Sequence, residues 1–160
     1  MNAIHIHRIS HWCYRHRIPV LPRLCYWLTF LLYNSSVPAS ADIGAGSRFA
    51  YGGIGVVIHA RATIGRNVTI GAQVTVGGRS GHYQVPIVED DVYLATGAKI
   101  LGPIRVGRGA IVGANAVVVH DVPPGAVVGG IPARILKTAS SRQSDERAAL
   151  AEVASWQQPA

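Results

Sequence analysis

The feature that most constrains this chain is an aliphatic residue that returns at every sixth position through its middle. Ten of the eleven positions in this row are aliphatic, and the row consists of Ile58, Ile64, Ile70, Val76, His82, Val88, Leu94, Ile100, Val106, Val112 and Val118. Four positions after each member comes a second residue that is mostly small or β-branched, as at Ala62 and Val68. A period of six matches neither the 3.6 of a helix nor the two of a strand, so each hexad is predicted to be a short strand followed by a turn.

Such hexads predict an all-β fold. Three of them would close one triangular coil, and successive coils would stack as parallel strands around an aliphatic interior. Glycine often follows the aliphatic residue, where we expect the corner to need a positive φ or a tight backbone; these glycines are Gly65, Gly71, Gly77, Gly107 and Gly113. The open ends of the stack require a cap at each end.

The repeat fails in two places. His82 is the polar member of the aliphatic row, and it lies in GGRSGHYQVP, Gly77 to Pro86, whose glycines and proline predict an extruded loop. A second irregularity, FAYGGIGVVIH from Phe49 to His59, shifts the register by three residues. A broken local rule inside a regular scaffold often marks function, and we expect the two interruptions to converge on a cleft.

The 160 residues correspond to about one domain with appendages. The predicted organisation is a basic and aromatic helical arm over residues 1–38, a β-helix over residues 39–137, and a polar tail over residues 138–160, in which Ser140 to Trp156 has alanine-rich helical character. The arm would cap the first coil. VPPGAVVGGIPARIL, which breaks the hexads with three prolines, would close the last one.

Charge is concentrated in the arm. The formal net charge is +7, and four arginines and four histidines fall within the first 23 residues. No zinc-finger, helix-turn-helix or RNA-binding signature accompanies them, so no nucleic-acid partner is expected. Cys13 and Cys25 form no CxxC pair, which predicts no metal site and favours a reducing cytoplasm.

The arm has two interpretations. The apolar run from Ile18 to Tyr33 is interrupted by prolines and an arginine, and it is shorter than the ~20 apolar residues that a spanning helix needs. One interpretation is a hairpin that packs on the core or at a subunit interface. The other is peripheral contact of residues 5–33 with the inner face of an anionic membrane, because arginines and tryptophans flank the leucines.

The repeat resembles that of the hexapeptide-repeat acyltransferase superfamily, in particular its branch of serine acetyltransferase-like and polysaccharide O-acetyltransferase proteins. The resemblance covers roughly Ala39 to Lys137 and implies a left-handed β-helix, acetyl-CoA as co-substrate, no metal, and a homotrimer. GGRSGHYQVPIVEDDVYLATGAKILG is similar to the family's glycine-rich loop with its histidine. His82 is thereby implied as the general base that takes a proton from the acceptor hydroxyl.

One departure from the serine acetyltransferases concerns Phe49–Gly55. Those enzymes carry an Asp-His pair in the corresponding segment, whereas this chain reads FAYGGIG. His59 lies nearby and is the second candidate catalytic residue. Acceptor binding is assigned to Tyr51, Arg79 and Tyr83.

The resemblance also implies where the donor binds. In the family, acetyl-CoA lies in a groove between adjacent β-helices, with its pantetheine arm beside small residues and its phosphates near cations. The corresponding small residues are Ala95, Gly97, Ala98, Gly113 and Ala114, and the cations are Lys99, Arg134 and Lys137.

Several functions remain open within this architecture. The sequence favours an O-acetyltransferase acting on a sugar hydroxyl of a surface polysaccharide, with a serine O-acetyltransferase as the alternative. A non-catalytic β-helix scaffold is a second alternative. A zinc hydratase of the same fold would need three converging histidines, and His59, His82 and His120 contain no closely spaced pair.

Overall fold

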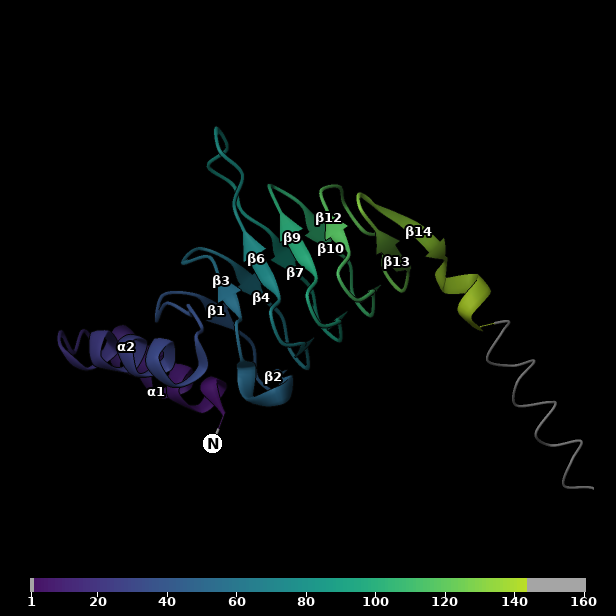
Figure 1. The fold of residues 1–160 in the computed structure, drawn as a ribbon. Helices are drawn as coiled ribbons and strands as arrows, with labels where there is room; N and C mark the ends of the chain where they lie inside the picture. Colours follow the sequence, from purple (N-terminus) through teal and green to yellow (C-terminus); the bar gives the residue numbers. More distant parts are fainter. Residues whose placement is uncertain (1, 144–160) are drawn as a thin grey trace, which may run out of the picture.

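The computed structural model describes residues 2–143, which form a two-helix arm followed by a stack of β-helical coils (Figure 1). The short strands form three sheets, one for each side of a triangular prism. Sheet 1 contains, in spatial order, β1 (Asp42–Ile43), β4 (Thr63–Ile64), β7 (Ile87–Val88) and β10 (Arg105–Val106). Sheet 2 contains β14 (Ala133–Lys137), β13 (Val127–Gly130), β11 (Ile111–Val112), β8 (Tyr93–Leu94), β5 (Thr69–Ile70) and β2 (Arg48–Phe49). Sheet 3 contains β12 (Val117–Val118), β9 (Lys99–Leu101), β6 (Thr75–Gly77) and β3 (Val57–Ile58).

The pairing is parallel throughout the coils, and equivalent members of the aliphatic row lie directly above one another. Ile64 pairs with Val88, and Ile70 pairs with Leu94. Every member of the row except His82 is at most 2% exposed. The second row is buried as well, except at Ser80 on the loop, and it includes Ala98 and Ala116. The prediction of a parallel β-helix with an aliphatic interior is confirmed.

Of the two roles expected for the glycines that follow the aliphatic residues, the structure supports a tight backbone and not a positive φ. Gly65, Gly71 and Gly107 do not adopt positive φ. A Cβ built on Gly71 would lie 2.5 Å from the backbone nitrogen of Thr96 in the next coil, so glycine is required there by close approach. Positive φ occurs two residues later, at positions such as Gln73 and Asn115.

The helical arm caps the first coil. The arm consists of α1 (Ala3–Arg15) and α2 (Leu21–Tyr33), which pack against each other. Asn2 caps the N-terminus of α1 by accepting from the Ile4 N–H, and its amide donates to the carbonyl of Phe49 at 2.8 Å. Ala3 and Ile4 belong to the same buried cluster as the β-helix core. None of the helices among residues 2–143 is long and apolar enough to cross a membrane.

The last coil ends in an antiparallel pair. β14 turns back against β13, which ends the parallel stacking, and residues 139–143 are helical. Arg142 ties this helical turn to the coil by donating to the carbonyls of Gly109 and Gly125. The rest of the predicted tail helix, residues 144–156, lies outside the described residues.

Candidate functional site

Each corner of the prism becomes a continuous edge because successive coils are in register. The loop edge joins sheet 3 to sheet 1 and comprises residues 59–62, 78–86, 102–104 and 119–121. The small-residue edge joins sheet 2 to sheet 3 and comprises residues 50–56, 71–74, 95–98 and 113–116. Sheet 3 lies between these two edges, which hold most of the candidate site residues.

His82 lies on the predicted loop, which projects from the prism between β6 and β7 (Figure 1). Its backbone N–H donates to the carbonyl of Arg79 at 3.1 Å, and the neighbouring Gly81 has φ +83°. This turn leaves the His82 side chain exposed. The imidazole is therefore accessible to a reactant at the loop edge.

Two contacts hold the loop against neighbouring coils. The guanidinium of Arg61 lies 3.9 Å from the centre of the Tyr83 ring, a cation–π geometry. At the base of the loop, the side chain of Arg79 lies beside Gly102, where an added Cβ would be 3.6 Å from the Arg79 Cβ. The structure thus brings Arg79, His82 and Tyr83 together. Arg61 was not predicted from the sequence, although its position two residues after His59 places it on the same edge.

His59 lies at the end of β3, next to the base of the loop. It is half-buried, and its ring lies 3.8 Å from where a Cβ on Gly78 would be. Its Nδ1 accepts a hydrogen bond from the backbone N–H of Arg61 at 3.1 Å. Since a neutral imidazole carries one proton, this bond puts the proton on Nε2, and His59 is arranged to donate from that atom.

The small residues assigned to the donor do stack on one edge. The backbone N–H of Asn115 donates to the carbonyl of Thr96 at 2.9 Å, and the backbone N–H of Gly97 donates to the carbonyl of Ala72 at 2.8 Å. Ala114 is exposed, and Ala95 and Gly113 are half-buried. Ala98 faces the core at 0% exposure, so its role is to permit close packing of the coil.

The three cations assigned to the donor are dispersed. The Lys99 ammonium lies along sheet 3, where it donates to the carbonyl of Gln73 at 2.6 Å and to the hydroxyl of Thr75 at 3.2 Å. Arg134 and Lys137 are exposed on β14, at the far end of the stack. The structure does not bring Lys99 to these two.

Tyr51 is not near the loop within this chain. It lies in the 3₁₀ turn η1 (Ala50–Gly53), with φ 52° and 75% exposure. This turn contains the predicted three-residue shift and follows sheet 2, whereas the His82 loop follows sheet 3. The turn therefore occupies a different edge from the loop, which corrects the expectation that the two interruptions converge; of the second segment, only His59 lies beside the base of the loop.

The three candidate zinc-binding histidines are too far apart. His59 follows β3 and His120 follows β12, three ladder steps away. At about 4.8 Å per step they are roughly 14 Å apart along the stack, too far to share an ion that needs ligands near 2 Å. Within residues 2–143, no three His, Cys, Asp or Glu side chains are grouped to hold a metal.

Comparisons with known proteins place this chain beside serine acetyltransferases. The serine acetyltransferase of Bacillus subtilis (strain 168) is 40% identical over 138 residues, which are 85% of this chain and 63% of that protein. A soybean serine acetyltransferase complexed with serine has a TM-score of 0.77 at 37% identity, covering 84% of this chain and 56% of that one. A serine acetyltransferase in complex with CoA has a TM-score of 0.76 at 34% identity, covering 84% and 55%. No family model matches the sequence.

The comparisons confirm the predicted left-handed β-helix and contradict the predicted sugar acceptor. The matching relatives are serine acetyltransferases, so the polysaccharide interpretation is wrong and the serine alternative is favoured. The chain spans about 63% of the length of the first curated relatives it matches. The chain belongs to the hexapeptide-repeat acyltransferase superfamily and is serine acetyltransferase-like.

Proposed function

We propose that this protein is a serine O-acetyltransferase that uses acetyl-CoA. The observation that carries the proposal is the 40% identity to a serine acetyltransferase over 138 residues, a stretch that includes most of the β-helix. Solved structures of similar chains hold serine and CoA. The accessible histidine on the loop edge is the group that the reaction requires.

In the proposed reaction His82 acts as the general base. Its imidazole takes the proton of the serine hydroxyl while the oxygen attacks the thioester carbonyl and forms a C–O bond. Collapse of the tetrahedral adduct breaks the C–S bond, and the imidazolium returns the proton to the leaving thiolate. O-acetylserine and CoA are the products, so atoms and charge balance.

The segment Phe49–Gly55 supplies neither Asp nor His, so the base must come from elsewhere. His82 fits the role of general base better than His59 does. Nδ1 of His59 already accepts a hydrogen bond from a backbone N–H, and its Nε2 is a donor. We assign His59 to hydrogen-bond donation, toward the carbonyl oxygen of the thioester or the carboxylate of serine.

Charge on the loop edge suits an amino-acid acceptor. Arg61 lies against the loop and Arg79 at its base, and both would attract the serine carboxylate. Acetyl-CoA would lie along the small-residue edge, with Ala95, Gly113 and Ala114 leaving space for its pantetheine arm. The cations on β14 would meet its phosphates.

The division of the site between two edges supports a homotrimer, in which the loop edge of one copy faces the small-residue edge of the next. Three prisms side by side would create three such interfaces. We also assign the enzyme to the cytoplasm, because Cys13 and Cys25 are both free thiols.

The test is release of free thiol from acetyl-CoA with L-serine as acceptor. We expect serine-dependent turnover that His82→Ala lowers by ~100- to 10,000-fold, the usual contribution of a general base. For His59, Asn keeps an acceptor near the position of Nδ1 but loses the Nε2 donor. Full activity in His59→Asn would therefore reduce His59 to a structural role.

His5→Ala is the matched control, since His5 is exposed on α1 and belongs to neither edge. It should leave turnover unchanged. Absence of serine-dependent thiol release from folded protein would contradict the proposed function. Turnover that survives in His82→Ala would instead contradict the assignment of the base.

A further inference from the structure

Helix α2 exposes its more apolar side to solvent. The buried residues on this helix are Cys25 and Thr29, both small. Its large apolar side chains are exposed, with Leu31 at 82% and Leu24 and Trp27 at 61% each. The remaining large apolar residues exposed on α2 are Leu21, Leu28, Phe30 and Leu32. A helix that is apolar all round is normally buried in a core or a membrane.

The exposed side chains form one continuous surface, which we call the α2 face: Leu24, Trp27, Leu28, Phe30 and Leu31. These five residues together line a single depression, and no polar residue is among them. Exposed apolar patches of this kind mark contact surfaces. The buried residues of α2, Cys25 and Thr29, lie outside this face, and α2 packs against α1.

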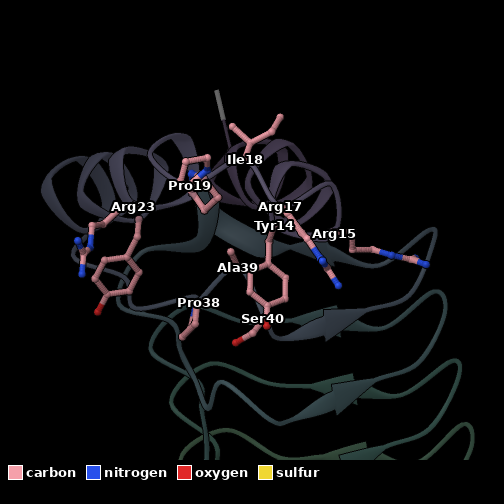
Figure 2. A pocket seen from close by; sticks show the side chains of 11 residues that line it. Tyr14, Arg15, Arg17, Ile18, Pro19, Arg23, Pro38, Ala39 and Ser40 are labelled. Atoms are coloured by element: carbon pink, nitrogen blue, oxygen red, sulfur yellow. The ribbon is translucent and has the colours of Figure 1, made fainter.

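The helical arm carries positive charge and no acidic residue of its own. Residues 2–33 contain four arginines and no Asp or Glu. Three of them, Arg15, Arg17 and Arg23, line a hollow of about 860 Å³ between the hairpin and the first coil. Figure 2 shows their side chains around this hollow, with Arg23 on one side and Arg15 and Arg17 on the other.

We propose that the helical arm docks this protein on an anionic membrane surface. The α2 face enters the boundary between headgroups and acyl chains, while Arg15, Arg17 and Arg23 contact lipid phosphates. The 13 residues of α2 rise about 20 Å, less than the ~30 Å hydrocarbon core, so the helix lies in the plane of the interface. This proposal is independent of the acetyltransferase activity.

Charge argues against a second copy of the arm as the occupant. Two arms meeting through their α2 faces would bring together two sets of arginines with no acidic partner in either arm. An anionic bilayer offers the opposite charge and an apolar interior in the same place. Trp12 and Trp27, exposed by 56% and 61%, are of the residue type that prefers this interface.

The experiment is flotation of the full chain with vesicles of phosphatidylcholine alone or of phosphatidylcholine with phosphatidylglycerol. We expect binding to the anionic vesicles only, weakened by salt. Leu31→Glu should lower the partition coefficient at least tenfold. Replacing Arg15 and Arg23 by Gln and Arg17 by Asn should lower it on the order of 100-fold, about fivefold for each charge.

Two control variants match these changes. Ile131→Glu puts the same charge on a side chain that is 74% exposed in the turn between β13 and β14, and Arg66→Gln removes an exposed arginine from the β-helix. Both should float like the unmodified protein. Circular dichroism melting of each variant shows whether the fold is retained.

The outcomes distinguish a membrane from a second copy of this chain as the partner of the α2 face. Failure of the unmodified protein to float with anionic vesicles overturns the proposal. So does equal flotation of Leu31→Glu, because the α2 face would then be uninvolved. If Leu31→Glu lowers the mass measured by light scattering and no vesicle binding occurs, the α2 face is an interface between copies. Flotation that about 10 mM inorganic phosphate lowers no more than sodium chloride of equal ionic strength supports a lipid surface over a free-phosphate site.

Discussion

At the scale of single residues, the buried histidine of α1 has a strongly lowered pKa. His7 is 3% exposed, and its Nδ1 has no hydrogen-bond partner within residues 2–143. Burial, together with the nearby His11 and Arg8, lowers the pKa of His7 from 6.5 to about 4, against the opposing influence of a hydrogen bond with the Ala41 backbone and of Asp42. The arm therefore packs on the first coil with this imidazole neutral.

Stability should fall in acid because the folded state resists protonating His7. Above pH 6.5 the residue is neutral in both states; between pH 6.5 and about 4 only the unfolded chain takes up the proton, which favours unfolding. The full effect is up to about 3 kcal/mol. Melting temperatures across this pH range should drop more steeply for the unmodified protein than for His7→Leu.

The exposed His5 on the same helix supplies the control. His5→Leu makes the same substitution at an exposed position of the same helix, and it should keep the slope of the unmodified protein. Equal slopes for His7→Leu and the unmodified protein would show that His7 does not link protons to folding.

The proposed catalytic residues could be predicted only where a pattern was broken. His82 was identifiable because it replaces an aliphatic residue in a row of eleven, and the structure places it on a projecting loop. The contact of Arg61 with Tyr83 could not be predicted, because it depends on the path by which the loop folds back over the preceding coil. The proton position on His59 depends likewise on one backbone N–H.

At the scale of the repeating element, the hexad has two demanding positions with different requirements. Gly71 must lack a side chain because Thr96 of the next coil approaches it, whereas Gln73 holds φ +57°. The sequence predicted only Gly71 as a corner residue, with either a positive φ or a tight backbone. Only the stacking of coils distinguishes close approach from positive φ, which is why the sequence alone left the role of these glycines open.

The two positions should differ in their sensitivity to substitution. Gly71→Ala forces the coils apart and should cost about 1–3 kcal/mol, as overpacking usually does. Gln73→Gly relieves a left-handed conformation but adds freedom to the unfolded chain, so its net effect should stay within about 1 kcal/mol. Urea denaturation of both variants measures this. Similar midpoints for the two would contradict separate roles for these corners.

The arm is the element whose sequence was most ambiguous, and both interpretations were reasonable. Its composition predicted helices, and the structure contains α1 and α2. Packing on the core and contact with a membrane appeared as alternatives because hydrophobicity does not show which face is buried. In the structure α1 provides the packing, while α2 leaves its larger apolar residues exposed.

At the scale of the whole molecule, the loop edge and the small-residue edge must cooperate although they are separated by the width of sheet 3. A single chain cannot bring His82 to the thioester of a donor bound beside Ala114 unless the donor crosses that sheet. A neighbouring prism removes the difficulty, because its small-residue edge can face the loop. Light scattering should then give three times the 17.0 kDa mass of the chain.

Complementation between two inactive variants tests whether each site is shared. His82→Ala removes the base, and Ala114→Trp blocks the donor at an exposed position of the other edge. Each variant alone should be inactive. In co-expressed mixtures, an interface is intact when an unmodified loop meets an unmodified small-residue edge, so about a quarter of the sites should recover in random trimers. If each site lies within one chain, every chain in the mixture carries one of the two substitutions. Thiol release would then stay at the level of the separate variants.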